Sequence, residues 1–179
     1  MSHLRPSVLR LLTAASIIAA PLAAQDTGIA VGAMAPGAAV HTLDGSAVNL
    51  STFLGKGPVV IEFWATWCPL CKQLEPALAA AKAKYGDRVT FIGMTVPQNQ
   101  TPERAKAFVE KNAMKGVFLF DTDGAASKAY AAPHTSYLVV INKAGKVVYT
   151  GVGGSQDVEA ALAPLGLAGG KAMMGGQHE

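Results

Sequence analysis

The chain has 179 residues, half of them apolar and 15% charged, so it is long enough for one well-buried core and too short for two ordinary domains. Its formal net charge is +3, but without Arg5 and Arg10 in the N-terminal segment the 15 basic residues become 13, which nearly balance the 12 acidic ones. This balance, and the lack of a basic block interleaved with aromatic residues, argue against a nucleic-acid partner.

The first 24 residues resemble a secretory signal peptide. They combine two arginines, an apolar run from Leu11 to Ala20 and small residues before Gln25. The apolar run falls short of the roughly 20 residues of a membrane-spanning helix, and no later segment is longer. We therefore expect a periplasmic or otherwise exported protein with no stable membrane insertion after signal cleavage. An uncleaved anchor is the alternative.

The predicted organisation after the signal is a single domain. Small residues make residues 25–30 an irregular lead-in, and the Gly-rich segment 167–179 is predicted to be a disordered tail. The expected boundaries are therefore 1–24 for the signal peptide, 25–30 for the lead-in, 31–166 for the folded domain and 167–179 for the tail.

The first half of the domain opens with an antiparallel hairpin. It covers residues 39–51 and turns at Asp44-Gly45. Residues 58–65 form a short apolar run interrupted only by Glu62, which predicts a central strand buried on both faces. A helix over 68–86 follows, with Leu70, Leu74, Leu78 and Ala81 at helical spacing and Pro76 inside it.

The second half alternates strands and helices before a second hairpin. Strands are predicted over 88–96 and 116–120, on either side of a helix over 101–113 that has Thr101 as its N-cap. A turn and short helix over 121–132, a hairpin over 136–152 and a last helix with Ser155 as N-cap complete the domain. This order predicts an α/β fold of three layers with a mixed sheet.

Cys68 and Cys71 are the only cysteines, and their position favours redox chemistry. Cys68 follows the buried strand and opens the helix, where unpaired N–H groups and the helix dipole favour a thiolate. We therefore expect an exposed, ionisable Cys68 sulfur, with Cys71 on the same helix face and able to attack a mixed disulfide. Pro69 fits the first helical turn. As a structural staple the pair would close too small a loop to stabilise the fold much.

Zinc binding is the main alternative for such a pair. A zinc site needs three or four protein ligands, and the histidines are scattered. His3 lies in the signal, His178 in the tail, and His41 and His134 are isolated. We expect no metal and no cofactor.

The stretch "FWATWCPLC" resembles the active-site strand-to-helix junction of the thioredoxin superfamily. The longer segment from Val31 to Pro76 is similar to exported TlpA-like thiol-disulfide oxidoreductases, and the resemblance extends to about Leu165. It implies a thioredoxin-like fold with an N-terminal β-hairpin extension. It also implies that Trp67 shields Cys68 and borders the substrate.

The resemblance assigns a role to Glu62, six residues before Cys68. Relatives use a buried acid there to exchange a proton with the resolving cysteine, so Glu62 is expected to accept the proton of Cys71. The alternative is a glutamate at a locally wet spot, or one paired with a lysine such as Lys56 or Lys72.

Relatives also carry a cis-proline loop facing the cysteines, and this chain departs from that pattern. The expected place falls near Ser136, while the nearest proline is Pro133. Either residue could fill the position. The loop, with Thr135, is still expected to line the substrate groove and to offer backbone groups to an extended peptide.

The expected function is dithiol-disulfide exchange with a protein client, with the protein as reductant fed by a membrane thiol donor, for instance in cytochrome c maturation. Two alternatives remain. A thioredoxin-fold peroxidase is disfavoured by "ATW" ahead of the reactive cysteine. A copper chaperone would use a downstream histidine, for which His134 is the candidate, and would space its cysteines one residue further apart.

Overall fold

A computed structural model describes residues 28–167, so the expected signal peptide and nearly all of the expected tail lie outside the described residues. The sheet has seven strands in the order β2-β1-β5-β4-β3-β6-β7. Their bounds are β1 Ala39–Thr42, β2 Ala47–Asn49, β3 Val59–Trp64, β4 Thr90–Thr95, β5 Val117–Phe120, β6 Tyr137–Ile141 and β7 Val147–Val152.

The sheet is mixed, as the order of the predicted elements requires. Strand β3 lies at its centre, parallel to β4 and antiparallel to β6, and β4 is parallel to β5. Hairpins close both edges, β1 with β2 and β6 with β7. All six residues of β3 are buried, which fits a continuous apolar strand covered on both faces.

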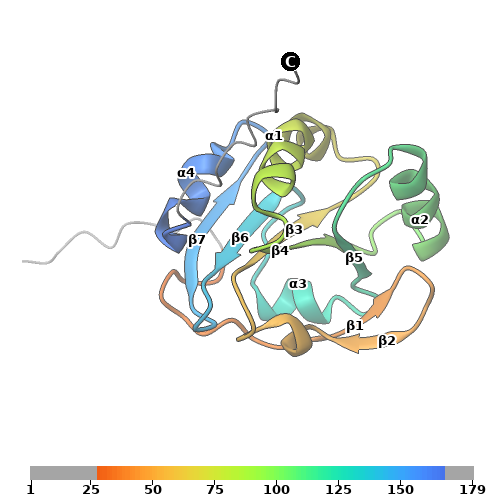
Figure 1. Ribbon diagram of the computed structural model, residues 1–179. Coiled ribbons are helices and arrows are strands. Elements are labelled where there is room, and N and C mark those ends of the chain that lie inside the picture. Colours follow the sequence, from red (N-terminus) through yellow and green to blue (C-terminus); the bar gives the residue numbers. More distant parts are fainter. Residues whose placement is uncertain (1–27, 168–179) are drawn as a thin grey trace, which may run out of the picture.

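Helices cover both faces of the sheet, giving the three layers that were predicted (Figure 1). The helices are α1 Pro69–Tyr85, α2 Pro102–Lys111, α3 Ala125–Ala129 and α4 Val158–Leu162, with 3-10 turns at Leu50–Phe53 and Ala163–Leu165. Helices α1 and α4 pack together on one face, where Leu74, Leu78 and Leu162 meet Val60 and other strand residues. Within the described part of the chain, no helix is long and apolar enough to cross a membrane.

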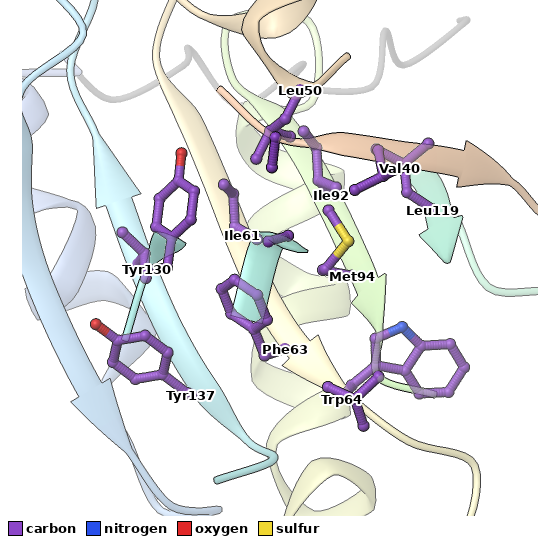
Figure 2. Close-up of a cluster of buried hydrophobic side chains, with 14 of the residues drawn as sticks. Val40, Leu50, Ile61, Phe63, Trp64, Ile92, Met94, Leu119, Tyr130 and Tyr137 are labelled. Carbon is purple, nitrogen blue, oxygen red and sulfur yellow. The ribbon is translucent and has the colours of Figure 1, made fainter. Parts of the chain in front are cut away.

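The opposite face carries the larger apolar core (Figure 2). Ile61 and Phe63 of β3 point into it, and the Phe63 ring lies 5.7 Å from that of Tyr130 and 5.8 Å from that of Tyr137. Because side chains alternate along a strand, Glu62 and Trp64 point the other way, toward α1 and α2, and Trp64 joins the cluster from that side. The strand thus sends its only charged side chain to the face that carries α1.

Two details of the helices differ from the sequence prediction. The N-cap of α4 is Asp157, whose Oδ1 accepts a hydrogen bond from the Ala160 N–H at 3.0 Å, whereas Ser155 accepts one from Gln73. Leu70 was expected at the buried helix positions and is 45% exposed. The buried stripe of α1 passes through Cys71, Leu74, Leu78, Ala81 and Tyr85, so Cys71 takes the buried place in the first turn and Leu70 lies beside the stripe.

Candidate active site

The cysteines lie where β3 gives way to α1, and they are joined by a disulfide with their Cα atoms 5.3 Å apart. Cys68 is the N-cap of α1, and its Sγ accepts a hydrogen bond from the Cys71 N–H at 3.0 Å. Pro69 occupies the first helical position, where no N–H is needed. The sulfur therefore takes up one of the helix's unpaired backbone donors.

The prediction of an exposed Cys68 sulfur is wrong for this oxidised form. Cys68 is 1% exposed and Cys71 6%, and both belong to the apolar core cluster. The disulfide and the hydrogen bond from the Cys71 N–H hold the Cys68 sulfur back over the first turn of α1, rather than turned toward solvent.

Glu62 and Cys71 line the same cavity, of about 670 Å³, between α1 and α2. Trp64 and Phe108, whose rings lie 5.8 Å apart, form part of its apolar wall. Glu62 is 6% exposed, and its Oε1 has no hydrogen-bond partner in the described chain. The structure thus brings the predicted acid and the predicted resolving cysteine to one cavity.

The environment of Glu62 favours its protonated form. Its pKa is raised from 4.5 to about 8: burial raises it most, the negative charge of Glu75 also raises it, and the positive charge of Lys82 lowers it. Glu75 and Lys82 form an ion pair with an N···O distance of 3.5 Å and line the same cavity. Neither Lys56 nor Lys72 pairs with Glu62 in the described chain, although Lys72 also lines the cavity.

The loop before β6 contains the residues expected around the cis-proline position. No cis peptide bond occurs among residues 28–167. Ser136 directly precedes β6, is fully buried and has φ +61°, and its N–H donates to the Phe63 carbonyl at 2.8 Å. Pro133 lies three residues earlier and is half-buried, as is Thr135, while His134 is exposed. Ser136 is therefore the residue that adjoins β3.

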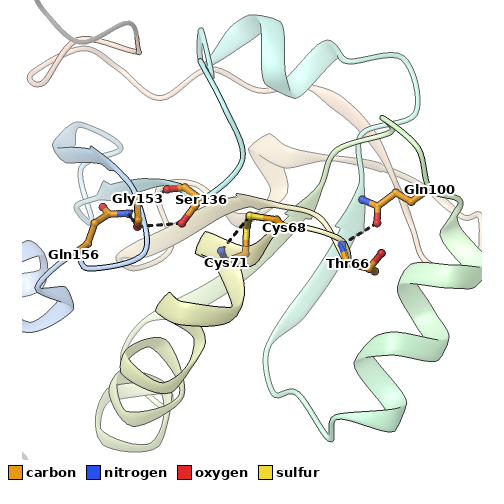
Figure 3. Close-up of a disulfide and its surroundings, with 7 residues drawn as sticks. All are labelled: Thr66, Cys68, Cys71, Gln100, Ser136, Gly153 and Gln156. Carbon is orange, nitrogen blue, oxygen red and sulfur yellow. Dashed lines mark hydrogen bonds between the residues drawn. A yellow bond between two sulfur atoms is a disulfide. The ribbon is translucent and has the colours of Figure 1, made fainter.

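The segment before Cys68 is braced by a loop that the sequence analysis did not single out (Figure 3). The buried Gln100 accepts a hydrogen bond from the Thr66 N–H at 3.0 Å and donates one to the Val96 carbonyl at 2.6 Å. Trp67 is 44% exposed, and its Nε1 donates to the Gln98 carbonyl at 2.8 Å. These contacts hold the partly exposed indole of Trp67 in place at the position before Cys68.

Potential metal ligands do not gather elsewhere in the described residues, where no group of three or more His, Cys, Asp or Glu side chains lies close enough to hold an ion. The copper alternative rests on His134, which is exposed in the loop before Ser136. A Cu(I) titration remains its direct test.

Comparisons with known proteins agree on one class. The Redoxin family matches residues 30–164. The thiol-disulfide oxidoreductase ResA of Bacillus thuringiensis subsp. konkukian is 30% identical over 118 residues, covering 66% of this chain and 67% of that protein. ResA of Geobacillus thermodenitrificans is 28% identical over 163 residues, covering 89% of this chain and 92% of the relative.

Solved structures with a similar fold also include disulfide oxidoreductases or related proteins. A secreted Mycobacterium tuberculosis disulfide oxidoreductase homologous to E. coli DsbE superposes with a TM-score of 0.58 at 25% identity, covering 69% of this chain and 90% of the other. The structure of DsbF from MTB, in mixed oxidised and reduced forms, gives a TM-score of 0.61 at 27% identity and covers 74% of this chain and 96% of the other.

Proposed function

This chain belongs to the Redoxin family and is a thiol-disulfide oxidoreductase of the thioredoxin superfamily, TlpA-like in type, and we propose that it acts as an exported reductant of protein disulfides. One observation carries the proposal: the Cys68–Cys71 disulfide opens α1, and Cys71 shares a cavity with the buried Glu62. The nucleophile, the resolving thiol and a base thus occur in one place.

In the first step the Cys68 thiolate attacks one sulfur of a client disulfide. A bond forms between Cys68 Sγ and that sulfur, the client disulfide breaks, and the second client sulfur leaves as a thiolate that takes a proton from water. Backbone donors at the start of α1 stabilise the attacking thiolate, as the Cys71 N–H already hydrogen-bonds Cys68 Sγ in the disulfide form.

In the second step Cys71 resolves the mixed disulfide. The ionised form of Glu62 takes the proton of the Cys71 thiol, and the resulting Cys71 thiolate attacks Cys68 Sγ and releases the first client sulfur as a thiolate. Two electrons have then passed from the protein to the client, and the Cys68–Cys71 disulfide has formed. A carboxyl with a pKa of about 8 suits this transfer because it lies close to the ordinary thiol value of about 8.5.

The proposed direction, as reductant, is supported by the burial of both cysteines. A buried, apolar site accommodates a neutral disulfide better than a thiolate, so the protein tends to give up electrons. Pro69 and Leu70 between the cysteines add no cationic group that would stabilise the thiolate. A membrane dithiol donor would return the two electrons, with cytochrome c maturation as one setting.

Trapping tests the proposal. In a Cys71→Ser variant the first step proceeds and the second cannot, so a client should stay bound to Cys68 as a mixed disulfide that a thiol reductant releases. A Cys68→Ser variant is the matched control and should trap nothing. If Cys71→Ser accumulates no mixed disulfide with a protein, or no more than Cys68→Ser does, the proposal fails.

The reduction potential tests the direction separately. Equilibration with glutathione mixtures should place the couple near the thioredoxin value of about −270 mV, rather than near the DsbA value of about −120 mV. A potential at the oxidising end would contradict the reductant role and leave the exchange chemistry intact.

A further inference from the structure

Ser136 is held in its left-handed conformation by a network of hydrogen bonds, two of which, those from its N–H and its Oγ, a proline could not make (Figure 3). Its Oγ donates to the Gly153 carbonyl at 3.0 Å, and its carbonyl accepts from the Gly153 N–H at 3.0 Å and from Gln156 Nε2 at 3.1 Å. With its N–H bonded to Phe63, every polar atom of Ser136 is used. A serine with positive φ persists only where its surroundings hold it there.

Gln156 joins this network to its neighbours. Its Nε2 also donates to the Gly153 carbonyl at 2.8 Å, and its Oε1 accepts from the Tyr149 hydroxyl at 3.2 Å. A Cβ atom at Gly151 would lie 2.5 Å from Gln156 Oε1, closer than real side chains approach. The lack of a side chain at Gly151 therefore leaves the space that the Gln156 side chain occupies.

The same segment is tied to the helix that carries the cysteines. Gln73 of α1 donates to Ser155 Oγ at 2.9 Å, and a Cβ atom at Gly154 would lie 2.5 Å from Gln73 Oε1. Residues 153–156 thus lie between the first turns of α1 and Ser136, and Figure 3 places Ser136 and Gln156 on one side of the disulfide and Gln100 on the other.

We infer that Gln156 is a positioning residue for client binding. It holds Ser136 at positive φ and so fixes the preceding residue, Thr135. An extended client segment then pairs with the backbone of Thr135. The inference rests on the proposed function. All polar groups of Ser136 are occupied, whereas the backbone of half-buried Thr135 makes no hydrogen bond within the described chain. An added strand binds through such free backbone groups.

Loss of Gln156 should weaken binding and leave the chemistry of the cysteines intact. In Gln156→Leu the held conformation of Ser136 becomes less populated, and the apparent affinity for a client falls by the same factor. We expect KM for insulin, used as a protein disulfide, to rise roughly tenfold, about what the net loss of one hydrogen bond gives. The kcat value and the rate at which dithiothreitol reduces the Cys68–Cys71 disulfide should each change less than about twofold.

Two further variants guard against a simple folding defect. Gln156→Glu keeps the volume and the acceptor for Tyr149 but cannot donate to the two carbonyls, so it should raise KM like Gln156→Leu. Ser155→Ala removes a hydrogen bond of the same segment without touching Ser136, and it should leave KM unchanged. An unchanged KM in both Gln156 variants, or an equal loss toward insulin and dithiothreitol, overturns the inference.

A pair of substitutions at Ser136 tests the same geometry. Ser136→Gly tolerates positive φ and should raise KM only slightly, about threefold or less. Ser136→Pro needs φ near −65° and lacks the N–H that bonds Phe63, so it should raise KM at least tenfold. A neutral Ser136→Pro would mean that the loop behaves as an ordinary proline loop. Failure of the wild-type protein to reduce insulin at all would instead refute the proposed function.

Discussion

Glu62 couples the stability of the whole fold to pH. Its pKa is about 8 in the folded protein and 4.5 in the unfolded chain, because burial penalises the carboxylate. Between these values the folded protein binds one proton more than the unfolded chain, so the free energy of unfolding falls as pH rises. The contribution is fully present below pH 4.5 and is lost once pH passes about 8.

Glu62→Gln should remove this dependence. The free energy of unfolding of the variant, relative to wild type, should increase by up to about 1.4 kcal/mol for each pH unit between about pH 5 and about pH 8. Urea unfolding of the oxidised protein at both ends of the interval measures the difference. Glu110→Gln, at an exposed position of α2, should keep the wild-type slope. Parallel curves for wild type and Glu62→Gln would show that Glu62 does not bind this proton.

At the residue scale, the sequence indicates the reactive groups better than the groups that position them. A single carboxylate in an apolar strand and two cysteines at its end stand out because each breaks a local pattern. Gln100 and Gln156 break none, since glutamine in a loop is ordinarily a solvated side chain. Their importance arises from backbone groups that only the folded chain brings near them.

At the scale of elements, α1 organises the electrostatics of the site. Glu75 and Lys82 are seven residues apart, which is two helical turns, so they share the face that looks onto Glu62. The side chains of Lys82 and Glu75 are 13% and 27% exposed, so solvent screens them less than surface charges. Helix α1 thus supplies both charges that adjust the proton affinity of Glu62.

Substitution of these two residues should move the pKa of Glu62 in opposite directions. Lys82→Met removes a nearby positive charge and leaves Glu75 unopposed, so the pKa should rise; Glu75→Gln should lower it. Each shift should be about half a unit or more for a partly buried pair. NMR titration of the Glu62 carboxyl carbon in the oxidised protein measures both. Lys72→Met, on the same helix and cavity, is the control and should cause a smaller shift. Shifts of the same sign would refute the arrangement.

Helix α1 also shows what helical spacing in the sequence does not predict. The Cys-Pro pair predicts the start of α1 correctly because the cap and the first position have local requirements. Burial of Leu70 does not follow from spacing alone, because Leu70 and Cys71 both stand at helical spacing from Leu74 and the fold buries Cys71. The N-cap of α4 fails similarly: Ser155 and Asp157 are both good caps, and Ser155 is engaged by Gln73 from another helix.

At the scale of the whole molecule, the order of strands and helices was enough to predict three layers. Which strands are neighbours in the sheet could not be predicted from that order. Strand β1 of the N-terminal hairpin pairs with β5, some 80 residues further along the chain, and no local signal reports such a pairing. The left-handed Ser136 likewise depends on Gly153 and Gln156, which follow an entire hairpin later.

The redox state should change the stability of the entire fold. The folded and unfolded protein, each in oxidised and reduced form, are the four states of a thermodynamic cycle. If the Cys68–Cys71 couple is more reducing in the folded protein than in the unfolded chain, the cycle requires the oxidised protein to have the larger free energy of unfolding. The four-residue loop closed by the disulfide contributes little entropy. The difference must therefore come from the site, where buried cysteines favour the neutral disulfide.

We accordingly expect the oxidised protein to unfold at higher temperature and higher urea concentration than the protein kept reduced by a phosphine. Every 30 mV by which the folded couple is more reducing should add about 1.4 kcal/mol to the free energy of unfolding of the oxidised form. A Cys68→Ala/Cys71→Ala variant should not respond to the phosphine. A reduced form that is the more stable one would mean that the fold favours the thiolate, and the protein would then serve as an oxidant of its clients.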